Sequence, residues 1–390
     1  MNTVTIGLVG SGYGAQLHCN GYKRVSGVNV RLKTIVDIDV KKAEKVAKQY
    51  GFENAIPDFN ELLLDEEIDI IDIVTPPMLH KDMIIKGLNA GKNIICEKPL
   101  TGYFGQAGDG IPIGKKVSKH QMYKEVIKDL EEINKVYKES GKQFMYAENF
   151  VYAPGIQKSA EIIRNKKSRI LFMKGEESLR GSSSPVAGNW DKTGGGSLIR
   201  VGCHPLGGML YLKRVEAETR DTEIKVKSIV ADTGFATVNV PEEEKKYFTV
   251  RPYDVEDIAT VTITFTDDTK ALVIAADTCL GGTKNYVEVY CNDASLVCNL
   301  TPTNVLETYF LDDDGLGNVY ISEMLPNKLG WNKVFIADEI LRGYVDELRD
   351  FVECVAYNRK PLSDFNLAYE TTKIIYAAYW SAEEGIRVEF

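Results

Sequence analysis

Apolar and polar positions follow two different periods in the first part of the chain. Short, nearly continuous apolar runs occur at 4–9, 28–36, 68–74, 93–96 and 144–147. Between them, apolar residues recur at helical spacing, most clearly over 79–89 and 121–139. Runs of the first kind are typical of buried strands, and the spaced pattern is typical of amphipathic helices. Their alternation predicts an α/β fold with a doubly wound parallel sheet, in which ligands bind at the carboxyl ends of the strands.

A different pattern begins at about residue 169. Apolar and polar residues alternate over 261–265, 271–275, 286–290 and 295–299, which predicts a large, open, mainly antiparallel sheet. Helical spacing returns over 337–358 and 366–382. We therefore expect an α/β domain at 1–150 and an α+β domain at 151–390, with the C-terminal helices packed back on the first domain.

Charge and composition exclude several classes of protein. The net charge of −9 and pI near 5.3 argue against nucleic acid or an anionic membrane as partner. No apolar segment reaches the length of a membrane span, and the first residues lack a signal-peptide pattern, so we expect a cytoplasmic location. The seven cysteines are scattered and form no C-x-x-C, a pattern that predicts neither a disulfide framework nor a metal site.

A glycine-rich turn follows the first predicted strand. The turn reads G-x-G-x-x-A, with Gly10, Gly12 and Ala15 at its fixed positions and Tyr13 and Gly14 between them. Gly10 allows the tight turn, Gly12 lets a pyrophosphate approach the backbone, and Ala15 lets the following helix pack on the strand. Free amides at a helix start favour phosphate. The pattern predicts a dinucleotide site, although such glycines also occur in ordinary turns.

An acidic residue ends the second predicted strand. Asp37 lies there, where a carboxylate accepts hydrogen bonds from a ribose diol and repels a 2'-phosphate. This predicts NAD as the cofactor, with NADP disfavoured. The alternative is a solvated strand-end carboxylate or a helix N-cap, a role for which Asp39 competes.

A lysine follows the strand at 93–96, in the sequence Glu97-Lys98-Pro99. At the carboxyl end of such a strand, Lys98 can hydrogen-bond a substrate hydroxyl and shuttle its proton. The alternative is a surface lysine paired with Glu97. Earlier in the chain, Thr75 and Pro76 end another buried strand and predict a loop over the nucleotide crevice.

A second group of polar residues follows the glycine triplet 194–196. Arg200 and His204 are expected one turn apart on one face of a helix. An imidazole accepts protons near neutral pH, and a partner on the preceding turn can orient it. The alternatives are a satisfied interior histidine and an exposed helix cation.

At these residues the chain resembles the Gfo/Idh/MocA (glucose-fructose oxidoreductase, inositol dehydrogenase and rhizopine catabolism) family over essentially its whole length. The resemblance rests on the turn at 10–15, on Thr75-Pro76-Pro77 with His80, on Ala90-Gly91-Lys92 leading to Glu97-Lys98-Pro99, on 194–204, on Val255-Glu256-Asp257, and on Ser381-Ala382-Glu383-Glu384-Gly385. The Glu-Lys-Pro sequence after this strand is specific for the family.

The resemblance implies a fold and roles for individual residues. It implies a Rossmann domain at 1–150 and, at 151–390, a domain that covers the substrate and mediates homo-oligomerisation. Lys98 and His204 match the family's catalytic lysine and histidine. Expected cofactor contacts are Gly10, Gly12, Tyr13, Gly14, Ala15, Asp37, Thr75, Pro76, His80, Glu97 and Lys98. Expected substrate contacts are Arg200, Asp191, Tyr152 and Glu148.

Two departures from the family pattern affect the substrate side. Arg200 stands where members commonly carry Asp, and a guanidinium cannot accept a proton. Asp191 is then a candidate replacement acid, while Arg200 could bind a substrate carboxylate or hydroxyl pair. The second departure is a glycine-rich insertion at 101–120, which we expect to shape the substrate mouth or a subunit contact.

Taken together, the sequence predicts an NAD-dependent oxidoreductase acting on a secondary hydroxyl of a sugar, cyclitol or glycoside. Oxidation of a glycoside at carbon 3 is one specific form. Two alternatives stay open: an NAD-dependent glycosidase without net redox change, and a nucleotide-sensing regulator without catalysis. Retention of Lys98 and His204 favours the enzyme, whereas Arg200 leaves the regulator open.

Overall fold

The first part of the chain forms a six-stranded parallel sheet in the order β3-β2-β1-β4-β5-β6. The computed structural model describes residues 1–301, 306–321 and 327–390. The strands are β1 (Thr3–Val9), β2 (Asn29–Val36), β3 (Asn54–Ile56), β4 (Ile70–Ile73), β5 (Asn93–Glu97) and β6 (Phe144–Ala147). The strand order reverses between β1 and β4, which opens the crevice where Rossmann sheets bind dinucleotides.

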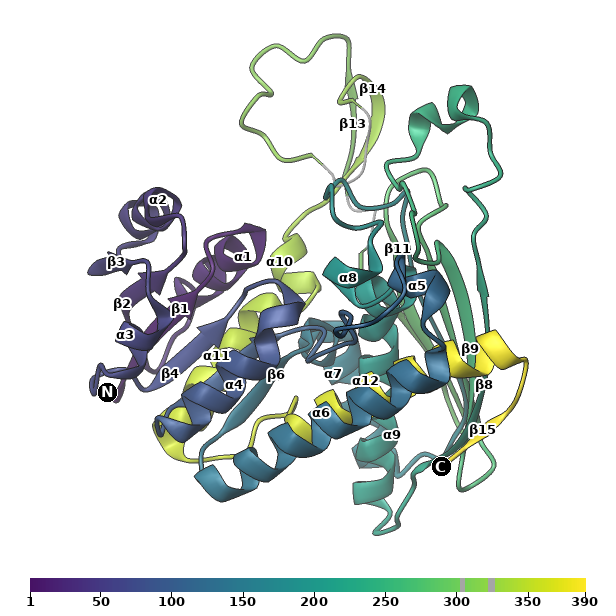
Figure 1. The fold of residues 1–390 in the computed structure, drawn as a ribbon, viewed down its shortest axis with the longest axis horizontal. Helices are drawn as coiled ribbons and strands as arrows, with labels where there is room; N and C mark the ends of the chain where they lie inside the picture. The colour runs from purple at the N-terminus through teal and green to yellow at the C-terminus, as the bar shows by residue number, and fades with distance from the viewer. Residues whose placement is uncertain (302–305, 322–326) are drawn as a thin grey trace.

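Helices connect these strands and cover the sheet (Figure 1). They are α1 (Tyr13–Tyr22), α2 (Val40–Tyr50), α3 (Phe59–Leu63), the short 3-10 turn η1 (Pro77–Leu79), α4 (His80–Asn89), α5 (Ile113–Lys116) and α6 (Lys119–Ser140). The apolar runs read from the sequence form the central strands because such runs are buried on both faces of a parallel sheet. The sheet predicted for the first 150 residues is confirmed.

A seven-stranded sheet follows, in the order β12-β11-β7-β10-β9-β8-β15. Its strands are β7 (Ile170–Ser178), β8 (Val226–Gly234), β9 (Ile258–Phe265), β10 (Lys270–Ala276), β11 (Lys284–Cys291), β12 (Ser295–Asn299) and β15 (Val388–Glu389). Adjacent strands run antiparallel except for β7 and β10, which run parallel at its centre. The prediction of a mainly antiparallel sheet is confirmed. The parallel pair arises because β7 and β10 are joined by a long crossover that includes a helix.

Helices join the two sheets. The turns and helices that precede β8 in the chain are η2 (Asn149–Tyr152), α7 (Pro154–Lys166), α8 (Trp190–Thr193), η3 (Leu198–Gly202) and α9 (Cys203–Thr219). Those that follow β8 are η4 (Glu242–Tyr247), α10 (Asp338–Leu341), α11 (Tyr344–Tyr357) and α12 (Phe365–Glu384). Helix α9 packs on β7, α11 packs on α1, and α12 lies along α6 and against β8, an arrangement visible in Figure 1.

A two-stranded hairpin, β13 (Leu306–Phe310) with β14 (Gly330–Val334), extends away from both sheets (Figure 1). Among the residues that the structure describes, no helix has the length and apolar character needed to span a membrane.

Candidate active site

The glycine turn leads from β1 into α1 and leaves room for a ligand. Gly10 has a φ of +105°, and a Cβ there would lie 2.7 Å from the Val74 carbonyl oxygen, so only glycine fits. A Cβ on Gly12, the N-cap of α1, would meet nothing within 4 Å. Ala15 is buried against the sheet. The start of α1 therefore fits a dinucleotide pyrophosphate, whose charge the helix amides favour.

Asp37 lies at the end of β2, beside this turn. Its Oδ2 accepts hydrogen bonds from the Ser11 backbone (3.0 Å) and hydroxyl (2.5 Å). Its Oδ1 accepts one from the Asp39 backbone at 2.9 Å. Asp39, not Asp37, caps α2. Asp37 is thus held at the turn, and its carboxylate keeps the capacity to accept from a ribose hydroxyl.

Two loops at the strand ends are joined by His80. Its Nδ1 lies 2.9 Å from the Pro99 carbonyl oxygen and its Nε2 lies 2.9 Å from that of Thr75. The ring is fully buried, so both nitrogens serve contacts within the protein. Thr75 and Pro76 remain partly accessible above the crevice. A direct cofactor contact from His80 stays a prediction.

Glu97 holds the turn that carries Lys98. Its Oε2 accepts from the Lys98 backbone at 3.0 Å, and its Oε1 lies 3.2 Å from Nε2 of His18. The other ring nitrogen of His18 lies 2.8 Å from Oδ2 of Asp72. Burial alone would lower the pKa of His18, but Asp72 and Glu97 raise it well above its usual value. The protonated His18 ring therefore links the carboxylates of Asp72 and Glu97 next to the turn that carries Lys98.

The Lys98 side chain turns away from Glu97 and into the space between the two domains. Its Nζ donates to the Arg200 carbonyl oxygen at 2.8 Å. A surface lysine paired with Glu97 is thus not what the structure contains. The contact fixes the ammonium group at the carboxyl end of β5, next to the segment that precedes His204.

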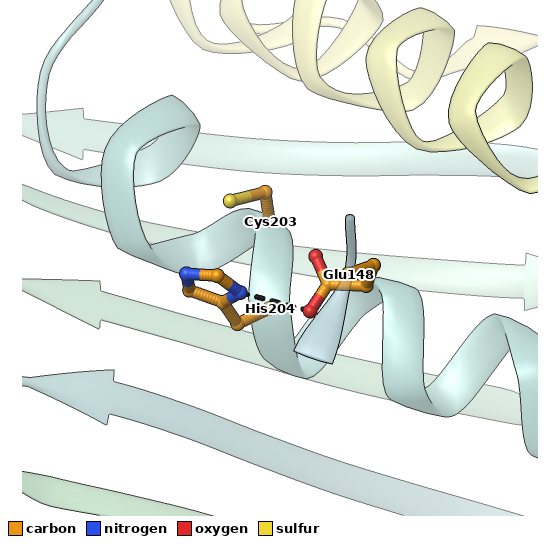
Figure 2. Close-up of side chains that lie close together, drawn as sticks. All are labelled: Glu148, Cys203 and His204. Atoms are coloured by element: carbon orange, nitrogen blue, oxygen red, sulfur yellow. Dashed lines mark hydrogen bonds and ion pairs between the residues drawn. The ribbon is translucent and has the colours of Figure 1, made fainter. Parts of the chain in front are cut away.

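His204 is paired with Glu148 (Figure 2). Its Nδ1 lies 2.8 Å from Oε1 of Glu148, and its ring stacks on Phe150 at 5.1 Å. Burial, together with the charges of Lys98 and Arg342, holds the pKa of His204 well below its usual value. Burial also raises the pKa of Glu148. The imidazole is therefore neutral at neutral pH, and a proton on Nδ1, directed at Glu148, leaves Nε2 as an acceptor.

The partner of His204 differs from the expected one. Asp191 was the candidate replacement acid, but it lies on α8 with its carboxylate 2.9 Å from Lys192. Glu148, expected to bind substrate, occupies that role instead. Glu148 follows β6, and β6 ends beside β5, so the parallel sheet brings this acid next to the Lys98 turn. Tyr152, also expected at the substrate, is buried and donates to Asp350 at 2.7 Å.

A π-helical turn, η3, carries Arg200 and leads into α9, which carries His204. The two side chains bond different acids, and His204 is held by Glu148 rather than by Arg200. The Arg200 guanidinium donates to Asp277, directly after β10. Only 14% of the Arg200 side chain and 2% of the Asp277 side chain are exposed. Sequence reasoning missed Asp277, although an acid directly after an alternating strand was a usable signal.

Glu256, which lies just before β9 of the second sheet, holds the glycine triplet 194–196 by hydrogen bonds. It accepts from the backbone of Gly196 and Leu198, each at 2.9 Å, and from the Tyr379 hydroxyl at 2.9 Å. Burial raises the pKa of Glu256 to about 7. A Cβ on Gly196 would lie 1.8 Å from the Glu256 carbonyl oxygen. The Val-Glu-Asp sequence thus positions the turn that carries the Arg200 carbonyl.

The 101–120 insertion lies against the second domain. The Tyr376 hydroxyl accepts from the Tyr103 backbone at 2.6 Å and donates to the Gly194 carbonyl at 2.7 Å. Trp190 donates to the Tyr103 carbonyl at 3.1 Å. The insertion therefore adjoins the glycine triplet, which is consistent with a role in shaping the substrate mouth.

Cys203 completes the buried group in Figure 2. Single ligand atoms of Glu148, Cys203 and His204 lie within 4.8 Å of one another. Burial raises the pKa of the Cys203 thiol strongly, and a protonated thiol is a poor metal ligand. The nearby Lys98 charge, felt by all three residues, also disfavours a cation. The arrangement suits a catalytic pair of an ammonium and a neutral imidazole better than it suits a metal ion.

Known proteins share both the sequence pattern and the fold. Residues 4–123 match the GFO_IDH_MocA model, described as an oxidoreductase family with an NAD-binding Rossmann fold. The levoglucosan dehydrogenase of Pseudarthrobacter phenanthrenivorans is 26% identical, over 98% of this chain and 97% of the relative. The D-glucoside 3-dehydrogenase of Escherichia coli is 21% identical over 98% of this chain and 97% of its own.

The solved structures extend the likeness to the whole fold. GenD2 from gentamicin A biosynthesis, crystallised with NAD, superimposes with a TM-score of 0.77 at 20% identity, over 100% of this chain and 97% of that one.

Proposed function

We propose that this chain is a member of the Gfo/Idh/MocA family, whose model its residues 4–123 match, and that it oxidises a secondary hydroxyl of a sugar, cyclitol or glycoside. The names of its relatives support this substrate class: levoglucosan dehydrogenase and D-glucoside 3-dehydrogenase match almost the full length of the chain. Oxidation of a glycoside at carbon 3 is the specific form we favour.

The observation that carries the proposal is the pairing of two proton-transfer groups next to a dinucleotide cradle. Lys98 is fixed by the Arg200 carbonyl at 2.8 Å, and His204 by Glu148 at 2.8 Å. Lys98 follows β5, and Glu148, the partner of His204, follows β6. These neighbouring strands end at the edge where such sheets bind their ligands.

The chain's own groups support a simple division of labour. The Lys98 ammonium donates to the substrate hydroxyl oxygen and stabilises the negative charge that develops there. Nε2 of His204 accepts the hydroxyl proton, and Glu148 stabilises the imidazolium that results. NAD, when bound, accepts the hydride from the carbon.

The dinucleotide would be held by the turn and by Asp37. The amides that begin α1 face the pyrophosphate, and Gly12 leaves the space for it. Asp37 would accept from the adenosine ribose diol, so NAD rather than NADP is bound. For Tyr13, Gly14, Thr75 and Pro76, cofactor contact is part of the same proposal. We also propose a homo-oligomer, with the open sheet of the second domain as the subunit contact.

Incubation of purified protein and NAD with free sugars, inositols and aryl glycosides tests the proposal. We expect NADH in amounts that match the keto product. Release of aglycone without NADH would instead identify the glycosidase alternative. Nucleotide binding without any turnover on the panel would favour the regulator.

A further inference from the structure

A buried polar pair lies on the sheet face next to His204. Asn285 of β11 is directly opposite Glu177 of β7. Two residues away along the same face, Gly175 of β7 faces Val287 of β11, and a Cβ on Gly175 would lie 2.7 Å from Cβ of Pro205. Pro205 follows His204 directly. The pair is therefore about 7 Å further along the sheet from the contact with this helix end.

Asn285 is buried without a partner for its side chain. Only 2% of the residue is exposed, and neither its amide nitrogen nor its amide oxygen finds a hydrogen-bond partner in the described part of the chain. The hydroxyl of Thr283, which directly precedes β11, is also buried and lacks a partner among the described residues. A buried polar group left without a partner destabilises the folded state. Neighbouring buried polar side chains without partners are expected where a polar ligand supplies their hydrogen bonds.

The Glu148 carboxyl group lies near Glu177 of the pair, and the charges of Lys98 and Arg342 also act there. Glu177 is 3% exposed. Burial raises the pKa of Glu148, and the Glu177 charge raises it further, so the two carboxyl groups interact. The cation on Arg200 is matched by Asp277. Directly beside the buried Glu177 carboxyl group, hydroxyl groups, which donate to carboxylates, are favoured over a substrate carboxylate.

We infer that Asn285 and Glu177 bind the ring hydroxyls that flank the oxidised carbon, and that the substrate is a neutral polyhydroxylated ring rather than an acidic sugar. The inference rests on the proposed function, whose site it completes. The Glu177 carboxylate accepts from hydroxyl groups, while the Asn285 amide donates and accepts. The assignment also explains why polar residues interrupt an inner face that elsewhere carries Val287 and Val289.

The chain offers a matched control for the test. Glu176, the neighbour of Glu177, alternates to the other face of β7 and pairs with Lys284 at 2.9 Å. Asn285→Ala, Glu177→Gln and Glu176→Gln are compared by kcat/KM with NAD, using the best neutral sugar and its deoxy analogues at the flanking positions. Sites built to bond a hydroxyl reject its absence strongly. The wild type should prefer the parent sugar at least about 100-fold.

Asn285→Ala and Glu177→Gln should lower kcat/KM for the parent sugar by about 10- to 100-fold, mainly through KM, and reduce that preference. Glu176→Gln should match the wild type. If the first two variants keep the wild-type preference, the inference is overturned. Efficient oxidation of the corresponding uronate by the wild type would overturn the neutral-substrate part.

Calorimetric binding of the same sugars to the NADH complex separates this inference from the proposed function. Sugar binding that depends on Asn285, without NADH formation by any variant, would overturn the proposed function alone. Normal turnover with binding that ignores Asn285 and Glu177 would overturn the inference alone.

Discussion

Arg200 is a buried cation whose charge is matched by one carboxylate. Its guanidinium donates to Asp277, and little of either side chain is exposed. Burial raises the pKa of Asp277, while the Arg200 charge opposes the rise. Removing one member of such a pair leaves the other charge buried and uncompensated. The pair should therefore matter for stability as well as for the shape of the site.

Arg200→Ala should lower the free energy of unfolding by about 3–5 kcal/mol, because Asp277 is then left alone. The double variant Arg200→Ala, Asp277→Ala should recover most of that loss. Urea denaturation of the wild type, both single variants and the double variant measures the coupling. If the losses of the two single variants add up to the loss of the double variant, the two residues are not energetically coupled. Arg200 would then be available to bind substrate.

Asp37 should set the cofactor preference. Asp37→Ala should weaken NAD binding by about 10- to 100-fold, because a charged hydrogen bond to the ribose is lost. Binding of NADP should weaken less, since a repulsive charge is removed as well. Dissociation constants for both nucleotides check this. An unchanged ratio would show that Asp37 only supports the Ser11 turn.

His204 should give the reaction a particular pH dependence. Burial, with Lys98 and Arg342, lowers the pKa of His204 well below 6.5. The active neutral form therefore persists through neutrality, and kcat/KM for oxidation should fall only below about pH 6.5. The free energy of unfolding depends on pH in the same direction. Below about pH 6.5 His204 takes up a proton in the unfolded chain before it does so in the folded one, so its contribution to stability is lost as the pH falls.

Kinetics between pH 5 and 8 test the first part. Comparison of unfolding free energies for the wild type and His204→Gln over the same range tests the second, because glutamine does not titrate. A loss of activity on acidification that is centred above pH 6.5 would contradict a lowered pKa for the base.

The residues that act locally could be predicted from sequence, and the pairings across the fold could not. Lys98 and His204 were singled out by their neighbours in the chain. The partners Glu148 and Asp277 lie 56 and 77 residues away from His204 and Arg200. No short sequence pattern indicates that β6 ends beside β5, or that β10 ends beside η3.

At the scale of elements, the π-helical turn determines how the two halves of the site meet. Lys98 reaches the Arg200 carbonyl within η3, and Glu256 bonds the backbone at the start of that turn. A helical repeat read from sequence has no means of locating one wider turn. The sequence therefore predicted the neighbourhood of Arg200 and His204 but not the turn that joins them.

Gly196→Ala tests the importance of this turn. Its Cβ would lie 1.8 Å from the Glu256 carbonyl oxygen, so backbone must move. We expect a loss of about 1–3 kcal/mol in unfolding free energy together with a fall in kcat. Gly317→Ala, where a Cβ meets nothing within 4 Å, is the control. Equal behaviour of the two variants in denaturation and turnover would argue against a tightly constrained turn.

At the scale of the whole molecule, two sheets meet along a site that neither completes alone. Lys98 and Glu148 follow two strands of the Rossmann sheet, β5 and β6. Asp277 follows β10 of the second sheet, and His204 lies on α9, which packs on that sheet. The two fold classes could be predicted because strand periodicity differs between buried parallel and half-covered antiparallel sheets. The β7–β10 pairing could not, because it joins strands about a hundred residues apart.

The central claim is that the Lys98 ammonium stabilises the oxygen of a substrate hydroxyl, whose proton His204 accepts and whose carbon gives a hydride to NAD. Its most direct test is NADH formation from the best sugar by the wild type and by Lys98→Ala, with NAD affinity measured for both. We predict that Lys98→Ala loses at least about 100-fold in kcat, as expected when a donor to the developing negative charge is removed, while its NAD affinity stays within a few-fold of the wild type. Wild-type turnover by Lys98→Ala would contradict the account.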